Sequence, residues 1–113
     1  MPIRSVGEIT VSAANTAAVT ACRAIPLDIH KHPFAVSFFL VKSGAGTGSA
    51  KVQHTGDNIF DPDVSPTWFD HADVTLATGN VDGNYAFPVR AVRVASVSAS
   101  ASNTWTLTVI QAG

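Results

Sequence analysis

The sequence contains little charge: Asp, Glu, Lys and Arg make up 13% of its 113 residues, against about 25% in a typical soluble domain. Seven basic and eight acidic residues give a net charge of −1 at pH 7. The lysines are scattered, and the nearest pair of cations is Arg90 with Arg93. Because a nucleic-acid-binding protein needs a concentrated basic surface, we expect no nucleic-acid partner. A surface this poor in charge must be covered by Ser, Thr, Asn and Ala or partly hidden in an interface, which indicates an assembled protein.

Cysteine and long apolar runs are also scarce. Cys22 stands alone, so no intrachain disulfide forms, and a free cysteine is most often a small buried hydrophobic residue. No apolar run approaches the ~20 residues of a membrane helix. Glu8 interrupts the N-terminal segment where a secretion signal would have its apolar core. We therefore expect no membrane association and synthesis in a reducing cytoplasm.

Catalytic signatures are lacking as well. Glu8 is the only glutamate, which leaves only Asp pairs for glycosidase-type chemistry. There is no Gly-x-Ser-x-Gly motif and no Cys–His signature. The glycine-rich segment 44–48 lacks the Gly-Lys-Ser/Thr of a phosphate-binding loop, and strands are expected on both sides of it, which predicts a hairpin loop. We expect a non-enzymatic protein without a cofactor.

Two groups of residues deserve consideration as metal ligands. His30 and His32 would share one face of a strand, and His54 or His71 would supply a third zinc ligand. Lys31 and the following proline indicate an exposed loop instead, and His54 is expected to be hydrogen-bonded and partly buried.

The acidic group is Asp57, Asp61 and Asp63. These carboxylates lie close together along the chain, but the segment lacks the central glycine and closing glutamate of an EF-hand loop. A looser calcium site is the alternative to turn-forming aspartates, and we favour the turns. No metal is expected at either group.

What is present is period-2 alternation, while helical periodicity is weak throughout. In 104–110, Trp105, Leu107 and Val109 alternate with threonines, as in a strand with one wet face. The expected strands are 7–12, 17–24, 26–30, 34–42, 49–55, 73–77, 88–98 and 104–110. Turn-forming residues separate them, including Pro33, 44–48, Pro62, Pro66 and 80–84. Residues 1–113 are predicted to form a single all-β domain, an antiparallel β-sandwich with seven or eight short strands and jelly-roll topology.

The segment 34–41 breaks this alternation, because it is apolar on both sides. Phe34, Val36, Phe38 and Leu40 fill one face, so Phe39 and Val41 project from the other. A strand with two apolar faces is either covered by another part of the chain or lies against another subunit. Both alternatives remain open at this stage.

Several strings between residues 50 and 113 resemble small virion proteins of tailed phages. They are Val52-Gln53-His54-Thr55, Phe60-Asp61-Pro62, Pro66-Thr67-Trp68-Phe69 with His71, Asp82-Gly83-Asn84-Tyr85-Ala86-Phe87-Pro88-Val89 with Arg93, and the C-terminal segment 106–113. Within that group the chain is similar to the capsid cement or staple proteins of short-tailed phages related to epsilon15 and the Bordetella phages.

This resemblance implies a structural protein on the exterior of an icosahedral capsid, which binds the major capsid protein and its own copies as a dimer or trimer. It implies stabilisation of contacts between capsomers. Bulky residues on the doubly apolar strand or in proline-rich loops, with arginines at the rim, are the expected contacts: Phe39, Val41, Trp68, Phe69, Tyr85, Arg90 and Arg93. The alternative is a carbohydrate- or receptor-binding module of the phage tail that uses Trp68, Phe69 and the carboxylates of 57–63.

Overall fold

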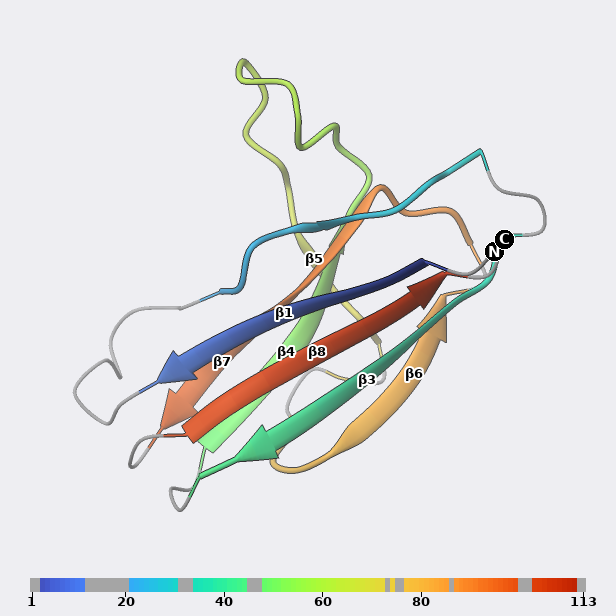
Figure 1. Ribbon diagram of the computed structural model, residues 1–113. Helices are drawn as coiled ribbons and strands as arrows, with labels where there is room; N and C mark the ends of the chain where they lie inside the picture. The colour runs from blue at the N-terminus through green and yellow to red at the C-terminus, as the bar shows by residue number, and fades with distance from the viewer. Residues whose placement is uncertain are drawn as a thin grey trace.

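The computed structural model describes residues 3–11, 21–30, 34–44, 48–72, 74, 77–85, 87–99 and 103–111. Within these residues the chain forms strands and no helix (Figure 1). The strands are β1 (Ile3–Val11), β2 (Ile25–Pro26), β3 (Val36–Ser43), β4 (Gly48–Thr55), β5 (Phe69–Asp70), β6 (Val81–Tyr85), β7 (Ala91–Ala99) and β8 (Asn103–Gln111). The predicted all-β class is confirmed.

The strands form two antiparallel sheets that pack face to face. Sheet A has the order β1-β8-β3-β6, and sheet B has the order β2-β7-β4-β5. The first strand pairs with the last, the second with the seventh, the third with the sixth and the fourth with the fifth. This is one long hairpin that is rolled up, so that β8 meets β3 and β7 meets β4. Such a strand order is that of a jelly roll, as the sequence predicted.

Alternate residues of each strand fill the space between the sheets. On β8, Trp105, Leu107 and Val109 are fully buried, while the threonines between them face outward. The other core residues are contributed mainly by β3, β4 and β7, and they include Val36, Phe38, Leu40, Val52, Val92 and Val94. Each such side chain contributes roughly 1.5–3 kcal/mol when it leaves water. This inward set fixes which residues face outward.

The segment between β3 and β4 is not a hairpin loop, contrary to the sequence prediction. β3 belongs to sheet A and β4 to sheet B, so the chain crosses from one sheet to the other there. Gly44, which follows β3, has φ of 107°, a conformation that glycine adopts without steric cost. Gly44 is therefore compatible with a turn, but the pairing partners of the two strands come from distant parts of the chain.

Residues 80–84 were predicted to be a turn, yet Val81–Tyr85 forms β6, an edge strand of sheet A. Asp82, Gly83 and Asn84 are typical turn formers. Their pairing with β3 opposes Gly83 to Phe38, and a Cβ on Gly83 would lie 2.9 Å from Phe38 Cε2 and closer still to Cζ. The glycine is explained by this contact and not by a turn.

Other boundaries differ from the predictions. β1 starts at Ile3 and not at residue 7, and the expected strand 26–30 is reduced to β2. β5 was not predicted. Parts of the expected strands 17–24 and 73–77 lie outside the described residues; within them, Ala21 and Ala77 form isolated bridges to Ala95 and Ala50.

Candidate interaction surfaces

The outward-facing side chains of sheet A form a regular array, which we call the sheet A face. The strand register aligns them in rows that run across the sheet. The central row contains Val6, Thr108, Phe39 and Asp82. The flanking rows contain Arg4, Ile110, Ser37 and Asn84 on one side and Glu8, Thr106 and Val41 on the other.

The middle of the sheet A face is apolar and exposed. Val6 is 48% exposed, Phe39 42% and Val41 45%. A shallow groove of about 240 Å³ runs beside them and is lined partly by Val81 and Asp82. Phe39 and Val41 are therefore on the surface, as the alternation of 34–41 predicted, and in the described part of the chain they remain uncovered.

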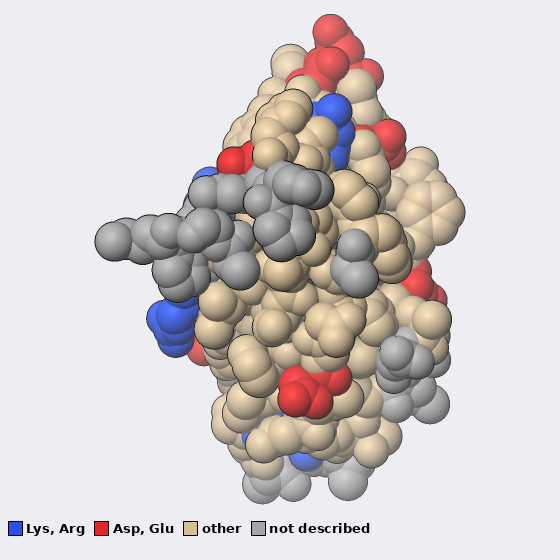
Figure 2. Space-filling model, turned by 90° about the vertical axis from the view of Figure 1, so that its right-hand side faces the viewer, with Lys and Arg blue, Asp and Glu red and all other residues tan. Residues whose placement is uncertain are grey.

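A second exposed surface lies where the free edges of β5 and β6 meet, and we call it the aromatic edge. Phe69 and Phe87 are 57% and 55% exposed. Half-buried His54 lies between them, with ring centroids 6.2 Å from Phe69 and 5.8 Å from Phe87. Viewed from the β6 side, the protein surface is mostly uncharged, and its acidic groups are separated from one another (Figure 2).

The aromatic edge is continuous with the core through Tyr85. Its ring packs edge-on against His54 at 5.1 Å and against His71 at 4.9 Å, and its hydroxyl is 3.0 Å from His54 Nδ1. Burial raises the pKa of Tyr85 above its ordinary value, and burial, followed by the neighbouring His71, lowers the pKa of His54. At neutral pH the ring of His54 is therefore uncharged and the Tyr85 hydroxyl is protonated.

Tyr85 itself is fully buried, so its prediction as a contact residue is wrong. The error follows from the missed strand β6, because the alternation of that strand places Tyr85 inward. Phe87, which follows β6, has the opposite character, because it is exposed. The aromatic edge therefore presents Phe69 and Phe87, with Tyr85 behind them.

The remaining predicted contact residues lie on the outer side of sheet B. The Arg93 guanidinium lies 4.2 Å from the centroid of the Trp68 ring, a cation–π geometry, and both residues are half-buried. Arg93 Nε also donates to Gln53 Oε1 at 2.9 Å. Arg90 is exposed. Trp68 thus has one ring face occupied by Arg93 and presents less free ring surface than Phe69.

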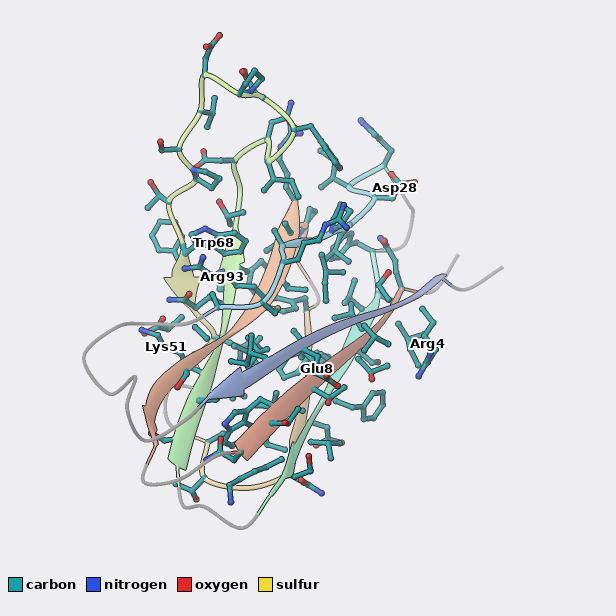
Figure 3. The ribbon with its side chains drawn as sticks, turned by 60° about the vertical axis from the view of Figure 1, so that its left-hand side comes forward. Arg4, Glu8, Asp28, Lys51, Trp68 and Arg93 are labelled. Atoms are coloured by element: carbon teal, nitrogen blue, oxygen red, sulfur yellow. The ribbon has the colours of Figure 1, made fainter. Side chains whose placement is uncertain are left out.

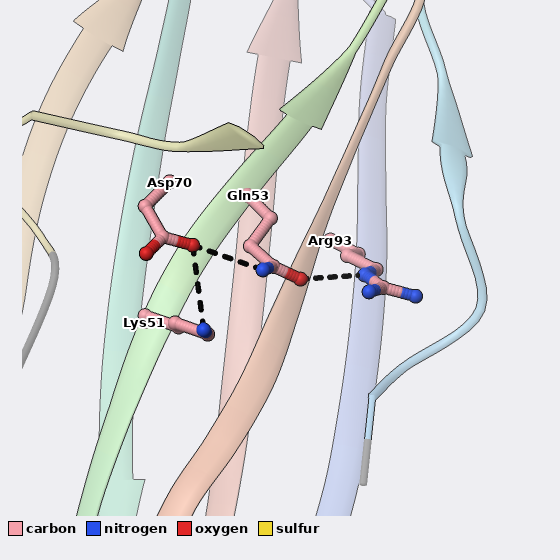
Figure 4. Close-up of polar contacts among 4 residues, drawn as sticks. All are labelled: Lys51, Gln53, Asp70 and Arg93. Atoms are coloured by element: carbon pink, nitrogen blue, oxygen red, sulfur yellow. Dashed lines mark hydrogen bonds and ion pairs between the residues drawn. The ribbon is translucent and has the colours of Figure 1, made fainter. Parts of the chain in front are cut away.

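Gln53 connects Arg93 to Asp70 and Lys51 (Figure 4). Its Nε2 donates to Asp70 Oδ1 at 2.9 Å, and Lys51 Nζ lies 3.4 Å from the same oxygen. The hydrogen bond from Gln53, with a smaller effect of Lys51, holds the pKa of Asp70 below its ordinary value. This network fixes the side chains on sheet B in defined positions.

The next residues to locate are the histidines that were considered as metal ligands. His30 is exposed and His32 lies outside the described residues, so the proposed pair is not placed. Among the described residues, no three His, Cys, Asp or Glu side chains lie together as a metal site would require. His54 is half-buried and hydrogen-bonded, as expected.

The acidic segment 57–63 forms turns, as we favoured. Asp57 Oδ2 accepts the Thr67 N–H at 2.7 Å, and Asp61 Oδ1 accepts the Asp63 N–H at 2.9 Å. Cys22 is buried, also as expected. Its Sγ accepts the Val94 N–H at 3.2 Å, and burial raises the pKa of its thiol, so the thiol stays protonated and packs as a small apolar group.

Sequence analysis missed part of both surfaces. Arg4, Val6 and Glu8 lie on the sheet A face, but the first strand was expected to begin at residue 7, after Arg4 and Val6. A sequence signal for the longer strand was present, because residues 4, 6 and 8 alternate with Ser5, Gly7 and Ile9. In Figure 3 the labelled Arg4 and Glu8 lie on the opposite side of the molecule from Lys51, Trp68 and Arg93.

Together these features define a class: a jelly-roll protein with two separate exposed apolar surfaces.

Comparison with known proteins adds little to it. No protein-family model and no curated protein matches the sequence. A solved structure from work on Bacillus endospore appendages, described as a family of disulfide-linked pili, aligns over 97% of this chain and 86% of its own, with 13% identity and a TM-score of 0.46. We draw no functional conclusion from a similarity at this level. Among the described residues there is no helix able to cross a bilayer.

Proposed function

We propose that this chain is a non-enzymatic structural protein of a tailed-phage virion, made in the host cytoplasm. In this proposal it binds the outer surface of the icosahedral shell and stabilises the contacts between capsomers. The resemblance of residues 50–113 to cement and staple proteins suggests the role. The structural observation that supports it best is the presence of two separate apolar surfaces on one jelly-roll body.

A protein that ties capsomers together needs at least two contact surfaces, because one surface only coats the shell. A standard specific interface takes about 800 Å² from each partner, and two such patches would use roughly a quarter of the 6276 Å² accessible surface of this chain. The sheet A face and the aromatic edge lie on different sides of the sandwich. Many identical copies on a shell then compensate for a modest affinity at each contact.

The first test is the copy number of this chain in purified particles, measured by quantitative mass spectrometry against the major capsid protein. We expect a number of copies comparable to that of the capsid protein. A handful of copies per particle would place the chain in the tail, and complete absence from particles would show the proposal to be wrong.

The second test assigns the contacts. Phe39→Asp alters the sheet A face and Phe69→Asp alters the aromatic edge, and both should reduce shell binding in a co-sedimentation assay with assembled shells. Phe60→Asp is the matched control, because Phe60 is an exposed phenylalanine in the loop 56–68, away from both surfaces. If neither Phe39→Asp nor Phe69→Asp weakens binding more than the control, our assignment of the surfaces is wrong.

One observation favours a second candidate, a saccharide-binding module of the tail. Phe69 and Phe87 are exposed aromatic residues of the kind on which sugars stack, with the polar Asp70 and Asn84 nearby along the chain. In this candidate Phe69 replaces Trp68 as the platform, because the Trp68 ring is stacked against the Arg93 guanidinium. Glycan-array binding that is lost on Phe69→Ala but retained on Trp68→Ala would support this candidate, and the absence of binding to any glycan would contradict it.

A further inference from the structure

The sheet A face has an ordered charge pattern along its β1 edge. Arg4, Val6 and Glu8 all point outward, so a cation, an aliphatic group and a carboxylate follow one another along the strand. Residues two positions apart in a strand are separated by about 6.8 Å, so the Cα atoms of Arg4 and Glu8 lie about 14 Å apart on either side of Val6. The Thr106 hydroxyl donates to Glu8 Oε2 at 3.4 Å, which links this carboxylate to the neighbouring strand β8.

This pattern is self-complementary about a two-fold axis. If the axis lies in the plane of the face, along the row of Val6, Thr108 and Phe39, a second copy packs with its strands antiparallel to those of the first. Val6 and Phe39 then meet their own counterparts in the middle, and each Arg4 faces the Glu8 of the other copy. We propose that the sheet A face is the interface of a face-to-face homodimer with this symmetry, in which Arg4 pairs with Glu8 of the second copy.

The alternative two-fold axis, parallel to the strands, fits worse. It would set β1 against β6 of the second copy, because these are the two edges of sheet A. Val6 would then cover the Asp82 carboxylate, and Arg4 would face the uncharged Asn84. A charge buried against an aliphatic side chain without a partner is costly. The first arrangement sets the two Asp82 carboxylates against each other, but of the two it is the one that pairs each Arg4 with a Glu8 and places Val6 against Val6, so we favour it.

The size of the sheet A face agrees with a second copy as its occupant. Four strands spaced by about 4.8 Å and about eight residues long give a sheet of roughly 19 by 27 Å, or about 500 Å² before the relief of the side chains is added. This approaches the roughly 800 Å² per partner of a standard interface. We expect a dimer of micromolar affinity. The arrangement also brings the two Asp82 carboxylates toward each other at the rim, which weakens it.

The inference rests on the proposed function only in assigning the sheet A face to a second copy. The aromatic edge of each copy is then left to contact the shell, and Phe39→Asp would weaken shell binding through loss of the dimer. Charge reversal on β1 tests the inference directly. The Arg4→Glu variant has two carboxylates on β1, and the Glu8→Arg variant has two guanidinium groups. Each variant alone places like charges opposite one another, so its homodimer should be weaker by about tenfold or more. When the two variants are mixed, every carboxylate faces a guanidinium and a heterodimer should form in preference to either homodimer.

The measurement is native mass spectrometry of the full chain and sedimentation velocity at micromolar concentrations. The expected result is a dimeric wild type, weakened single variants, and a heterodimer fraction well above the statistical half. Arg90→Glu, a charge reversal off the sheet A face, should leave the dimer unchanged, and Asp82→Asn should tighten it severalfold. A monomeric wild type, or a statistical mixture of variants, would overturn the inference.

Shell binding separates this inference from the proposed function. A chain that sediments as a monomer yet binds assembled shells would remove the dimer and leave the decoration role in place. A dimer that responds to the charge reversals as expected but does not bind assembled shells would support the dimer and contradict the decoration role.

Discussion

The outer faces of the two sheets follow the same alternation but differ in what lies over them. On sheet A, the outward residues Val6, Phe39 and Val41 remain close to half exposed. On sheet B, the outward residues Thr55 and Gln53 are buried, although both are polar. One sheet thus presents apolar groups to its surroundings while the other buries polar ones.

The cover on sheet B is supplied by the chain itself. The loop 56–68 rises beyond the end of β4 (Figure 1), and it returns with Trp68 over the Arg93 guanidinium. At the start of the same loop, Thr55 Oγ1 accepts the Asp57 N–H at 3.1 Å. The polar groups of sheet B are therefore paired within the chain. Within the described residues the apolar groups of sheet A have no such cover, which is why we assign contacts with other molecules to that face.

The largest expected effect is on the inner face of sheet A. We expect substitutions to be tolerated on the outer face of this sheet but not on its inner face. Gly83 and Asp82 are neighbours on β6, but Gly83 points inward onto the Phe38 ring. Gly83→Ala places a Cβ against that ring, which packs against His71 and Tyr85 and has no room to move. We expect a loss of about 2–3 kcal/mol in the free energy of unfolding, measured by urea denaturation.

Two variants check this interpretation. Asp82→Ala, on the exposed side of the same strand, should change stability by less than about 0.5 kcal/mol. Gly79→Ala, where a Cβ would have nothing within 4 Å, should be equally mild. A Gly83→Ala variant as stable as these two would show that the Phe38 ring yields.

The next effect tests whether the polar network on sheet B matters for stability. Gln53→Leu removes the acceptor of Arg93 Nε and the amide donor to Asp70 Oδ1, at a cost of about 1–2 kcal/mol in unfolding free energy. Ser37→Leu, a polar-to-apolar change on the sheet A face, should cost less than about 0.5 kcal/mol. Equal losses at the two positions would contradict the comparison of the faces.

The Gln53→Leu variant also has a pH signature. Because the Gln53 amide lowers the pKa of Asp70 in the folded state, the bond stabilises the protein above the ordinary aspartate value of 3.8. That contribution is lost as the pH falls through the lower folded pKa. The stability gap between wild type and Gln53→Leu should therefore narrow below about pH 4.

A smaller and more closely matched test replaces threonine by valine on both faces. Thr55→Val removes a buried hydroxyl that accepts the Asp57 N–H, and we expect a loss of about 1 kcal/mol. Thr108→Val on the sheet A face exchanges a half-exposed hydroxyl for a methyl group and should change the unfolding free energy of the monomer by less than about 0.5 kcal/mol. If Thr108→Val destabilises the chain as much as Thr55→Val, the two outer faces do not differ as described.

The sequence predicts well what depends on neighbouring residues. The alternation of threonine with Trp105, Leu107 and Val109 identified β8 and its inward face, and the count of strands with the turns between them indicated the sandwich. These features depend on period-2 spacing alone. The prediction that Phe39 projects outward succeeded for the same reason.

The sequence predicts poorly what depends on distant residues. β6 has the composition of a turn, and only the Phe38 ring, more than forty residues away, explains Gly83. Once β6 was missed, Tyr85 was assigned to the surface. The cover over Gln53 and Thr55 likewise comes from how the loop 56–68 folds back, which alternation within β4 does not encode.

The smallest expected effect concerns His54, on the inward side of β4 where the two sheets meet at the aromatic edge. Burial lowers its pKa below the ordinary 6.5, as does the nearby His71, while Asp70 acts in the opposite direction. Above pH 6.5 the ring is neutral in both the folded and unfolded chains. As the pH falls below that value, the unfolded chain takes up the proton more readily, so the folded state loses stability until the lower folded pKa is passed. His54→Gln, which retains an acceptor for the Tyr85 hydroxyl, should flatten this dependence in urea denaturation between about pH 7 and pH 5. Identical slopes for wild type and His54→Gln would mean that the half-buried ring between Phe69 and Phe87 is solvated as freely in the folded chain as in the unfolded one, and that the aromatic edge is more open than its packing indicates.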